Sequence, residues 1–148
     1  MSKVGAGVLL MHRGKLGLIL RDNNPNIAWP NTWAMPGGGQ EVGELLTKTA
    51  KRELREELSI RPKVNPLGMT ERGNGIFFCN LSDQIWRKVR LREGQRFAFF
   101  WPFEINKLEL GGEFRTMFGA YPDQVKQMIA SGQVPCPCTL GLVPWEGR

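Results

Sequence analysis

The alternation of apolar and polar positions predicts a series of short strands separated by turns. Two apolar runs near the start flank the tripeptide Arg13-Gly14-Lys15, which predicts a tight turn between the first two strands. A later run, Ile-Phe-Phe-Cys-Asn-Leu, has the β-branched and aromatic residues that strands favour. The predicted strands cover residues 4–12, 16–21, 76–81, 84–91 and 95–103, and another short strand with turns is expected within 61–75.

Two segments have helical patterns instead. Residues 44–58 contain neither glycine nor proline, which predicts a helix. A second helix is predicted at 121–132, where Gly132 ends it, and a short helical turn is expected within 104–110. The first helix has an apolar stripe at helical spacing, formed by Leu46, Ala50, Leu54 and Leu58.

The length of 148 residues suits one compact domain, and no repeat or linker divides the chain. We expect a single α/β domain over residues 1–132, in which strands and helices pack together. Residues 133–148 are rich in proline and glycine and have no periodicity, so an irregular and partly mobile tail is expected. Within it, Trp145 is a candidate to fold back onto the domain.

Composition indicates a globular protein, with 41% hydrophobic and 23% charged residues. The formal net charge of +6 raises three kinds of polyanionic partner: nucleic acid, a membrane surface or a phosphorylated small molecule. The basic residues are scattered along the chain. Their densest run, Arg87–Arg92, alternates with apolar residues, which favours an exposed strand face over a dedicated anion-binding patch.

The three cysteines, Cys79, Cys136 and Cys138, form neither a disulfide framework nor a four-ligand zinc pattern. A reducing compartment fits this usage best. The sequence contains no apolar run of the 18 or so residues that span a bilayer, and the apolar part of the first eleven residues is too short for a signal peptide. We therefore expect a cytoplasmic location.

Three carboxylates gather on the first predicted helix. At 3.6 residues per turn, Glu53, Glu56 and Glu57 lie within about 100° of arc, at the margin of the apolar stripe. Like charges at this spacing repel, and a hard cation such as Mg²⁺, which prefers oxygen ligands, would offset the repulsion. The stretch taken alone fits an ordinary solvated helix better, because four basic residues are interleaved with the acids: Lys48, Lys51, Arg52 and Arg55.

The preceding glycines, Gly37-Gly38-Gly39, exclude two phosphate-binding motifs. Gly38 and Gly43 have the glycine spacing of a P-loop, but Glu44 and Leu45 follow where that motif needs Lys and Ser or Thr. A glutamate there would repel phosphate. The glycines do not complete G-x-G-x-x-G either, so a Rossmann site is not supported.

Taken together, residues 38–60 resemble the Nudix box, G-x5-E-x7-R-E-U-x-E-E-x-G-U, where U is a bulky aliphatic residue. The matching positions are Gly38, Glu44, Arg52, Glu53, Leu54, Glu56, Glu57 and Ile60. The sequence departs from the pattern at Ser59, where the family has glycine. A left-handed conformation at that position would make serine unfavourable by about 1 kcal/mol.

The resemblance implies a Nudix fold, in which a mixed β-sheet lies between helices, and hydrolysis of a nucleoside diphosphate linked to another group X. It implies that Glu53, Glu56 and Glu57 hold Mg²⁺, or Mn²⁺ in its place, together with the carbonyl of Gly38. Arg52 would act in the same catalytic site by pairing with Glu44 or with one of the ligand glutamates.

The sequence Glu93-Gly94-Gln95 also resembles the loop of the MutT-like branch, which hydrolyses nucleoside triphosphates. Glu93 is therefore a candidate ligand or general base, with a solvated turn residue as the equal alternative. The proton acceptor is expected among Glu56, Glu57 and Glu93. Arg21 could steer the anionic substrate or lie at the rim of the site. Three aromatic residues are candidates for stacking on the base, although packing is the commoner role of such residues: Trp29, Trp33 and Phe78.

The expected reaction is Mg²⁺-dependent cleavage of a nucleoside triphosphate, damaged or dCTP-like, to a nucleoside monophosphate and pyrophosphate. Two alternatives stay open: a nucleotide-sugar or dinucleotide hydrolase, and a non-catalytic module that binds a nucleotide or RNA. The expected partner is a small nucleotide. A membrane or a nucleic acid is not expected, and a homodimer is left open.

Overall fold

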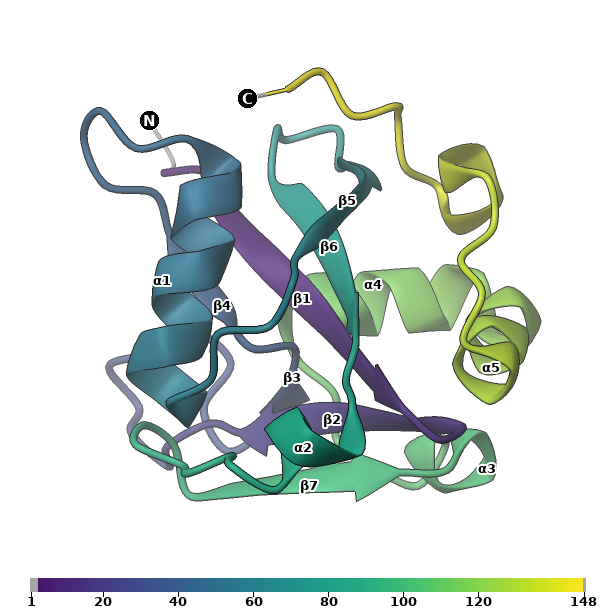
Figure 1. Ribbon diagram of the computed structural model, residues 1–148, viewed down its shortest axis with the longest axis horizontal. Coiled ribbons are helices and arrows are strands. Elements are labelled where there is room, and N and C mark those ends of the chain that lie inside the picture. Colours follow the sequence, from purple (N-terminus) through teal and green to yellow (C-terminus); the bar gives the residue numbers. More distant parts are fainter. Residues whose placement is uncertain (1–2, 148) are drawn as a thin grey trace.

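The computed structural model describes residues 3–147, so the ends of the predicted domain and tail at residues 1, 2 and 148 lie outside the described part. A mixed β-sheet has helices on both faces (Figure 1). The strands are β1 (Gly5–His12), β2 (Lys15–Leu20), β3 (Trp33–Ala34), β4 (Gly37–Gly39), β5 (Asn65–Met69), β6 (Gly75–Asn80) and β7 (Arg96–Phe100). The helices are α1 (Leu46–Leu58), α2 (Asp83–Trp86), α3 (Pro102–Ile105), α4 (Gly112–Ala120), α5 (Pro122–Ser131) and the 3₁₀ helix η1 (Pro137–Leu140).

The centre of the sheet is β1, which pairs in parallel with β6 and antiparallel with β2 and β4. The strand order is β3-β2-β1-β6-β5, while β4 adds to β1 and β7 adds to β2. The sheet is therefore mixed, and the predicted α/β fold is confirmed. The pairing of β4 with the start of β1 fixes the glycine run beside α1 (Figure 1).

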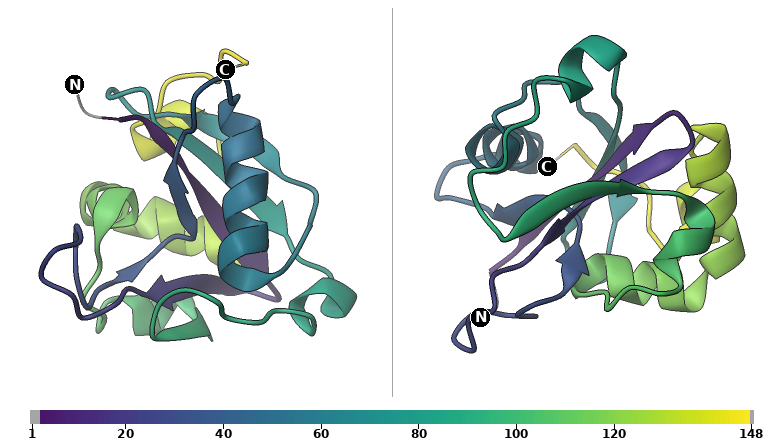
Figure 2. Two further views of the ribbon diagram at one scale, coloured as in Figure 1. Left: turned by 90° about the vertical axis from the view of Figure 1, so that its left-hand side faces the viewer. Right: turned by 90° about the horizontal axis from the view of Figure 1, so that it is seen from below.

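Helices lie on both faces of the sheet (Figure 2), and a hydrophobic cluster packs each set of helices against the sheet. On one face, the predicted apolar stripe of α1 packs against the sheet, with Ala50, Leu54 and Leu58 fully buried. On the other face, a second cluster joins α4, α5 and η1 to the sheet. The stripe predicted for the first helix is thus confirmed, and it orients the neighbouring carboxylates towards β4.

In the part of the chain that the structure describes, no helix combines the length and apolarity needed to cross a membrane.

The strand predicted at 84–91 is wrong. This segment starts with α2, whose cap is Ser82, because the serine hydroxyl accepts a hydrogen bond from the amide of Ile85 (3.2 Å). Further along, the amides of Arg90 and Arg92 donate to the last carbonyls of α1, at 2.9 and 2.7 Å, rather than to a neighbouring strand. The alternation of basic and apolar residues therefore comes from an irregular loop with one side packed on α1's core layer.

The sequence also misses α4 and predicts the last strand too long. Glycines at positions 111, 112 and 119 lower the helix propensity of the α4 segment, so its pattern is weak. Burial of Phe114, Met117 and Phe118 against the sheet offsets that low propensity. The predicted strand at 95–103 ends at Phe100, because Pro102 starts α3 and has no amide to pair in a sheet.

The C-terminal segment packs against the domain, and it is irregular apart from the short 3₁₀ helix η1. Pro137–Leu140 form η1, which ends at Gly141, and the backbones of Val143 and Met69 exchange two hydrogen bonds of 2.9 Å. Leu140 and Leu142 are buried, and Trp145 lies edge-on to Phe77 with ring centroids 5.0 Å apart. The division of the chain at residue 132 stays a prediction.

Candidate metal and nucleotide site

Backbone contacts of the glycine strand β4 hold it against the carboxylates of α1. The amide of Gly37 donates to Glu57 Oε1 at 2.7 Å. At Gly38, a Cβ atom would lie 2.4 Å from Glu53 Oε1, so any larger residue would push that carboxylate away. Gly37 also has a φ of 153° and no room for a side chain next to the Ala6 carbonyl. The glycine run therefore serves a close approach of backbone to carboxylates.

Glu57 is a buried carboxyl, with 8% of its surface exposed. Burial raises its pKa to about 8, and the charges of Glu53 and Glu93 act in the same direction. The Gly37 hydrogen bond and the charge of Arg21 oppose this rise. A neutral, proton-bearing Glu57 is therefore the favoured form in the metal-free protein near neutral pH, and a cation would compete with that proton.

The side chains of Glu53, Glu57 and Glu93 form a cluster of three carboxylates. Each offers one oxygen, and these oxygens lie within 4.8 Å of one another. Burial raises the pKa of Glu53, against the effect of its hydrogen bond with Arg52. Close oxygen donors with a shared excess of negative charge are the ligand set of a hard divalent cation such as Mg²⁺. The donor chemistry thus fits the predicted ion.

Glu93 reaches this cluster from a loop between α2 and β7. The loop is fixed on both sides, because the amide of Arg92 donates to Glu57 O at 2.7 Å and that of Gln95 to Leu20 O at 2.8 Å. The side-chain amide of Gln95 also donates to Arg21 O and to Asn31 Oδ1. Gly94 between them has a φ of 92°, a left-handed conformation that glycine adopts without strain.

Arg52 links the loop before α1, strand β4 and the carboxylates through one guanidinium. Its Nε donates to Glu44 Oε2 (2.8 Å), one Nη to Glu53 Oε1 (2.9 Å) and the other to Gly39 O (2.9 Å). Hydrogen bonds from Arg52 and then Thr49 lower the pKa of Glu44 to about 2. These contacts in turn raise the pKa of Arg52, chiefly through Glu44. The sequence allowed pairing with Glu44 or with a ligand glutamate, and the structure contains both contacts.

Glu56 lies outside the three-carboxylate cluster. Its side chain is 43% exposed, and its Oε2 accepts a hydrogen bond from Arg52 Nη1 at 3.1 Å. A contact with the shared guanidinium therefore connects Glu56 to the site. Its role as a metal ligand, like that of the Gly38 carbonyl, stays a prediction.

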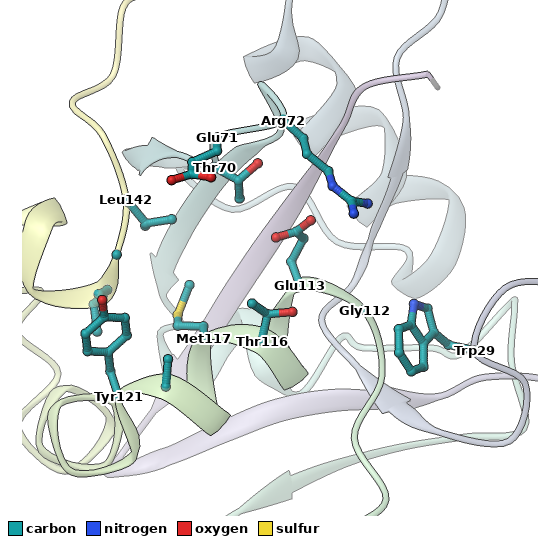
Figure 3. Close-up of a pocket in the computed structure, with 13 residues that line it drawn as sticks. Trp29, Thr70, Glu71, Arg72, Gly112, Glu113, Thr116, Met117, Tyr121 and Leu142 are labelled. Atoms are coloured by element: carbon teal, nitrogen blue, oxygen red, sulfur yellow. The ribbon is translucent and has the colours of Figure 1, made fainter. Parts of the chain in front are cut away.

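A cavity of about 280 Å³ opens beside β4, and Arg21 lines it together with all three glycines of that strand. Arg21 directly follows β2, and its Nε donates to Ala28 O at 2.8 Å, which holds the guanidinium at the rim. A larger cavity of about 550 Å³ adjoins it and shares three lining residues: Trp29, Gly112 and Glu113. In Figure 3, Glu113 and Arg72 extend into this space, while Trp29 and Tyr121 lie at opposite ends. Together the two cavities lead away from the glycine strand.

The aromatic candidates divide between packing and the cavities. Trp33 lies edge-on to Phe100 (4.8 Å between centroids), and Phe78 packs against the buried cluster beneath α4 and α5. Neither lines either cavity. Trp29 lines both. Sequence reasoning missed Glu113, which accepts a hydrogen bond from Asn74 Nδ2 (3.1 Å), because it lies on a helix that was not predicted.

Comparison with known proteins assigns the sequence that forms this site to a family. A family model of the NUDIX domain matches residues 1–104, which include β4, α1 and Glu93. The chain belongs to the Nudix family. The Nudix box predicted from residues 38–60 and the mixed sheet both lie within the matched region.

Two curated relatives are similar over part of their length. The chain is 32% identical over 101 residues to an ADP-ribose pyrophosphatase of Methanocaldococcus jannaschii, which covers 64% of the chain and 57% of the relative. It is 40% identical over 58 residues to the m7GpppN-mRNA hydrolase NUDT17 of Xenopus laevis, which covers 39% of the chain and 20% of the relative. The chain thus spans from a fifth to little more than half of these relatives.

Among solved structures, one described in a study of MutT from Aliivibrio salmonicida and Vibrio cholerae is similar, with a TM-score of 0.65 and 16% identity. The likeness covers 88% of this chain and 98% of the MutT chain. It therefore extends beyond residue 104 and supports the same fold for most of the molecule.

Proposed function

We propose that this Nudix protein is a Mg²⁺-dependent hydrolase that cleaves the phosphoanhydride bond of a nucleoside diphosphate linked to a further group. The observation that carries this proposal is the cluster of Glu53, Glu57 and Glu93, whose oxygens lie within 4.8 Å of one another. These acids come from a helix and a distant loop, and they adjoin a cavity lined by Arg21 and the glycine strand. Such convergence is typical of a functional site rather than of a solvated helix face.

The proposed roles follow from charge and exposure. Glu53 and Glu57 hold the ion beside Glu93, with Glu56 and the Gly38 carbonyl as further predicted ligands. A bound Mg²⁺ would neutralise the diphosphate oxygens and lower the pKa of an attacking water. Glu93 is the proposed proton acceptor, because it is exposed on a loop, whereas Glu57 is buried against Gly37 and Glu56 is engaged by Arg52.

The other residues bind and orient the reacting groups. Arg52 positions Glu53 relative to the glycine strand through its bonds to Glu53 and Gly39. Arg21, at the rim of the smaller cavity, attracts the anionic substrate. The base or the second group X would occupy the adjoining space beyond Trp29.

A nucleoside triphosphate is the first candidate substrate, with a nucleoside monophosphate and pyrophosphate as products. It is supported by the loop Glu93-Gly94-Gln95, whose glutamine side chain bonds both Arg21 O and Asn31 Oδ1 and so holds Glu93 at the carboxylate cluster. A nucleotide sugar such as ADP-ribose is the second candidate. The 32% identity to an ADP-ribose pyrophosphatase and the additional cavity of about 550 Å³ favour it.

The test is a substrate panel measured with Mg²⁺ and again with excess EDTA. It contains the eight (d)NTPs, oxidised dGTP, ADP-ribose, other nucleotide sugars and dinucleotides, and the products are separated by chromatography. Release of pyrophosphate supports the first candidate, whereas release of a nucleoside monophosphate with a sugar phosphate supports the second. If no compound were cleaved but nucleotides bound, the non-catalytic alternative would replace the hydrolase proposal.

A further inference from the structure

The outward side of α1 carries a cluster of unpaired cations. Lys48, Lys51 and Arg55 lie three and four residues apart, so they share one face of the helix, and all three are exposed. Arg61 follows the helix and is exposed as well. These four residues line a groove of about 480 Å³, together with Glu44, Arg52 and Pro62. We call this the basic groove; in the left view of Figure 2, α1 lies at the front of the molecule.

Nothing within residues 3–147 neutralises these four cations, since none of them forms an ion pair with a described carboxylate. Glu44 is the one acid that lines the groove, and Arg52 and Thr49 Oγ1 already occupy its carboxylate, at 2.8 and 2.7 Å. The favourable interaction of cations with a helix C-terminus applies to Arg55 in the last turn, but not to Lys48 or Lys51. Water and salt screen these exposed cations, and no described carboxylate is fixed against them, so the cluster is free to bind an anion.

We propose that the basic groove binds the sugar-phosphate backbone of single-stranded nucleic acid. At 1.5 Å per residue, Lys48 and Arg55 are separated by about 10 Å along the helix, comparable to the span of a few consecutive phosphates. The groove has no aromatic lining on which bases could stack, so recognition is through phosphates and is independent of sequence.

Two other polyanionic surfaces fit this groove less well. A duplex-binding module buries about 600–1,000 Å² of surface, whereas this groove is a small concavity that a flexible single strand can follow. Binding at a membrane surface needs apolar side chains among the cations, but Pro62 is the one apolar residue in the lining. The inference departs from the sequence-based expectation that nucleic acid is not a partner, because the cations on one face of α1 line a groove together with Arg61.

The experiment measures fluorescence anisotropy of a labelled 12-nucleotide single-stranded RNA, in EDTA so that the RNA binds without metal. The test variant is Lys51→Ala/Arg55→Ala. Its matched control is Lys107→Ala/Lys126→Ala, which removes the same charge from α5 and from the segment after α3. The test pair should weaken binding by at least about tenfold, because two charge-assisted contacts are lost. The control pair should stay within about twofold of the parent, where the weakening from net charge alone is expected.

A salt series distinguishes local contacts from a general effect of net charge. With two phosphate contacts removed, the slope of log K against log salt should become less negative by about 1.4 in the test variant. Equal losses in the two pairs, no RNA binding by the parent at low salt, or binding to anionic vesicles but not to RNA would each overturn the proposal. Both variants should keep the parent's circular dichroism spectrum and its Mg²⁺-dependent turnover of small nucleotides, so failure here is distinguishable from failure of the proposed hydrolase function.

Discussion

The two sides of α1 carry charges of opposite sign, and the two sets of charges differ in burial and in pairing. On the side facing β4, Glu53 and Glu57 are largely buried and cluster with Glu93. Glu53 accepts a hydrogen bond from Arg52, and Glu57 accepts one from the Gly37 amide. On the outward side, the cations of the basic groove are exposed and unpaired within the described residues. A charge that is removed from water needs a partner held at a fixed position, whereas an exposed charge is stabilised by water and can bind a ligand from solution. The helix thus separates a preorganised site from a surface suited to a polyanion.

The largest effect should come from Glu57→Gln, which replaces a predicted metal-binding carboxyl on the buried side with an amide. Turnover of the preferred substrate should fall by about 10³-fold or more, because the ion loses a ligand. The amide Oε1 can still accept the Gly37 hydrogen bond, so the fold should be kept. Initial rates and a thermal melt measure both quantities.

The matched control is Glu109→Gln, which makes the same change at an exposed glutamate outside the carboxylate cluster. Its rate should equal that of the parent. Near-normal turnover in the Glu57 variant would count against the metal assignment.

Replacing one arginine on each side of α1 with methionine compares the two sides by their effect on the free energy of unfolding. Arg52→Met leaves the carboxylates of Glu44 and Glu53 partly buried without their partner, which should lower the free energy of unfolding by about 3 kcal/mol. Arg55→Met, three residues away on the exposed side, should change it by about 0.5 kcal/mol or less. Urea denaturation in EDTA measures both values. Equal effects would show that the guanidinium of Arg52 has no special place in the network.

The pH dependence of stability isolates the buried carboxyl. In the metal-free protein the pKa of Glu57 is raised from 4.5 to about 8. Between these values the folded chain keeps a proton that the unfolded chain has released, so the free energy of unfolding falls as pH rises. The stabilising contribution is complete below about pH 4.5 and lost by about pH 8.

Denaturation of the parent and of Glu57→Gln in EDTA at several pH values between 5 and 8 measures this contribution. The variant should lack the decline, because its amide does not titrate. Parallel profiles would place the proton on another group.

The smallest effect concerns Ser59, the C-cap residue at which α1 ends. It adopts the left-handed conformation predicted from the family pattern, with a φ of 59°, and its amide donates to Arg55 O at 3.1 Å. Ser59→Gly should raise the free energy of unfolding by about 1 kcal/mol with turnover unchanged, since glycine adopts this conformation without steric cost. A decrease in stability would mean that the serine side chain makes a compensating contact.

The features that could be predicted from the sequence are local. The apolar stripe and the acidic margin of α1 follow from 3.6 residues per turn, and the spacing of Gly38 to Glu57 follows from one tight connection into one helix. The segment 84–91 could not be predicted in the same way. Its pattern favours a strand, but hydrogen bonds from Arg90 and Arg92 to the end of α1 hold it in another conformation.

The sequence by itself determined the family pattern and the acids of α1, because these depend on short-range spacing along one helix and its preceding turn, and the resemblance to the Nudix family then implied the mixed α/β fold. Only the tertiary structure decided that Glu93 joins Glu53 and Glu57, and that Trp29 rather than Trp33 or Phe78 lines the cavities. Those arrangements depend on contacts between residues distant in the chain, whose positions are set by packing of the whole sheet and not by local periodicity.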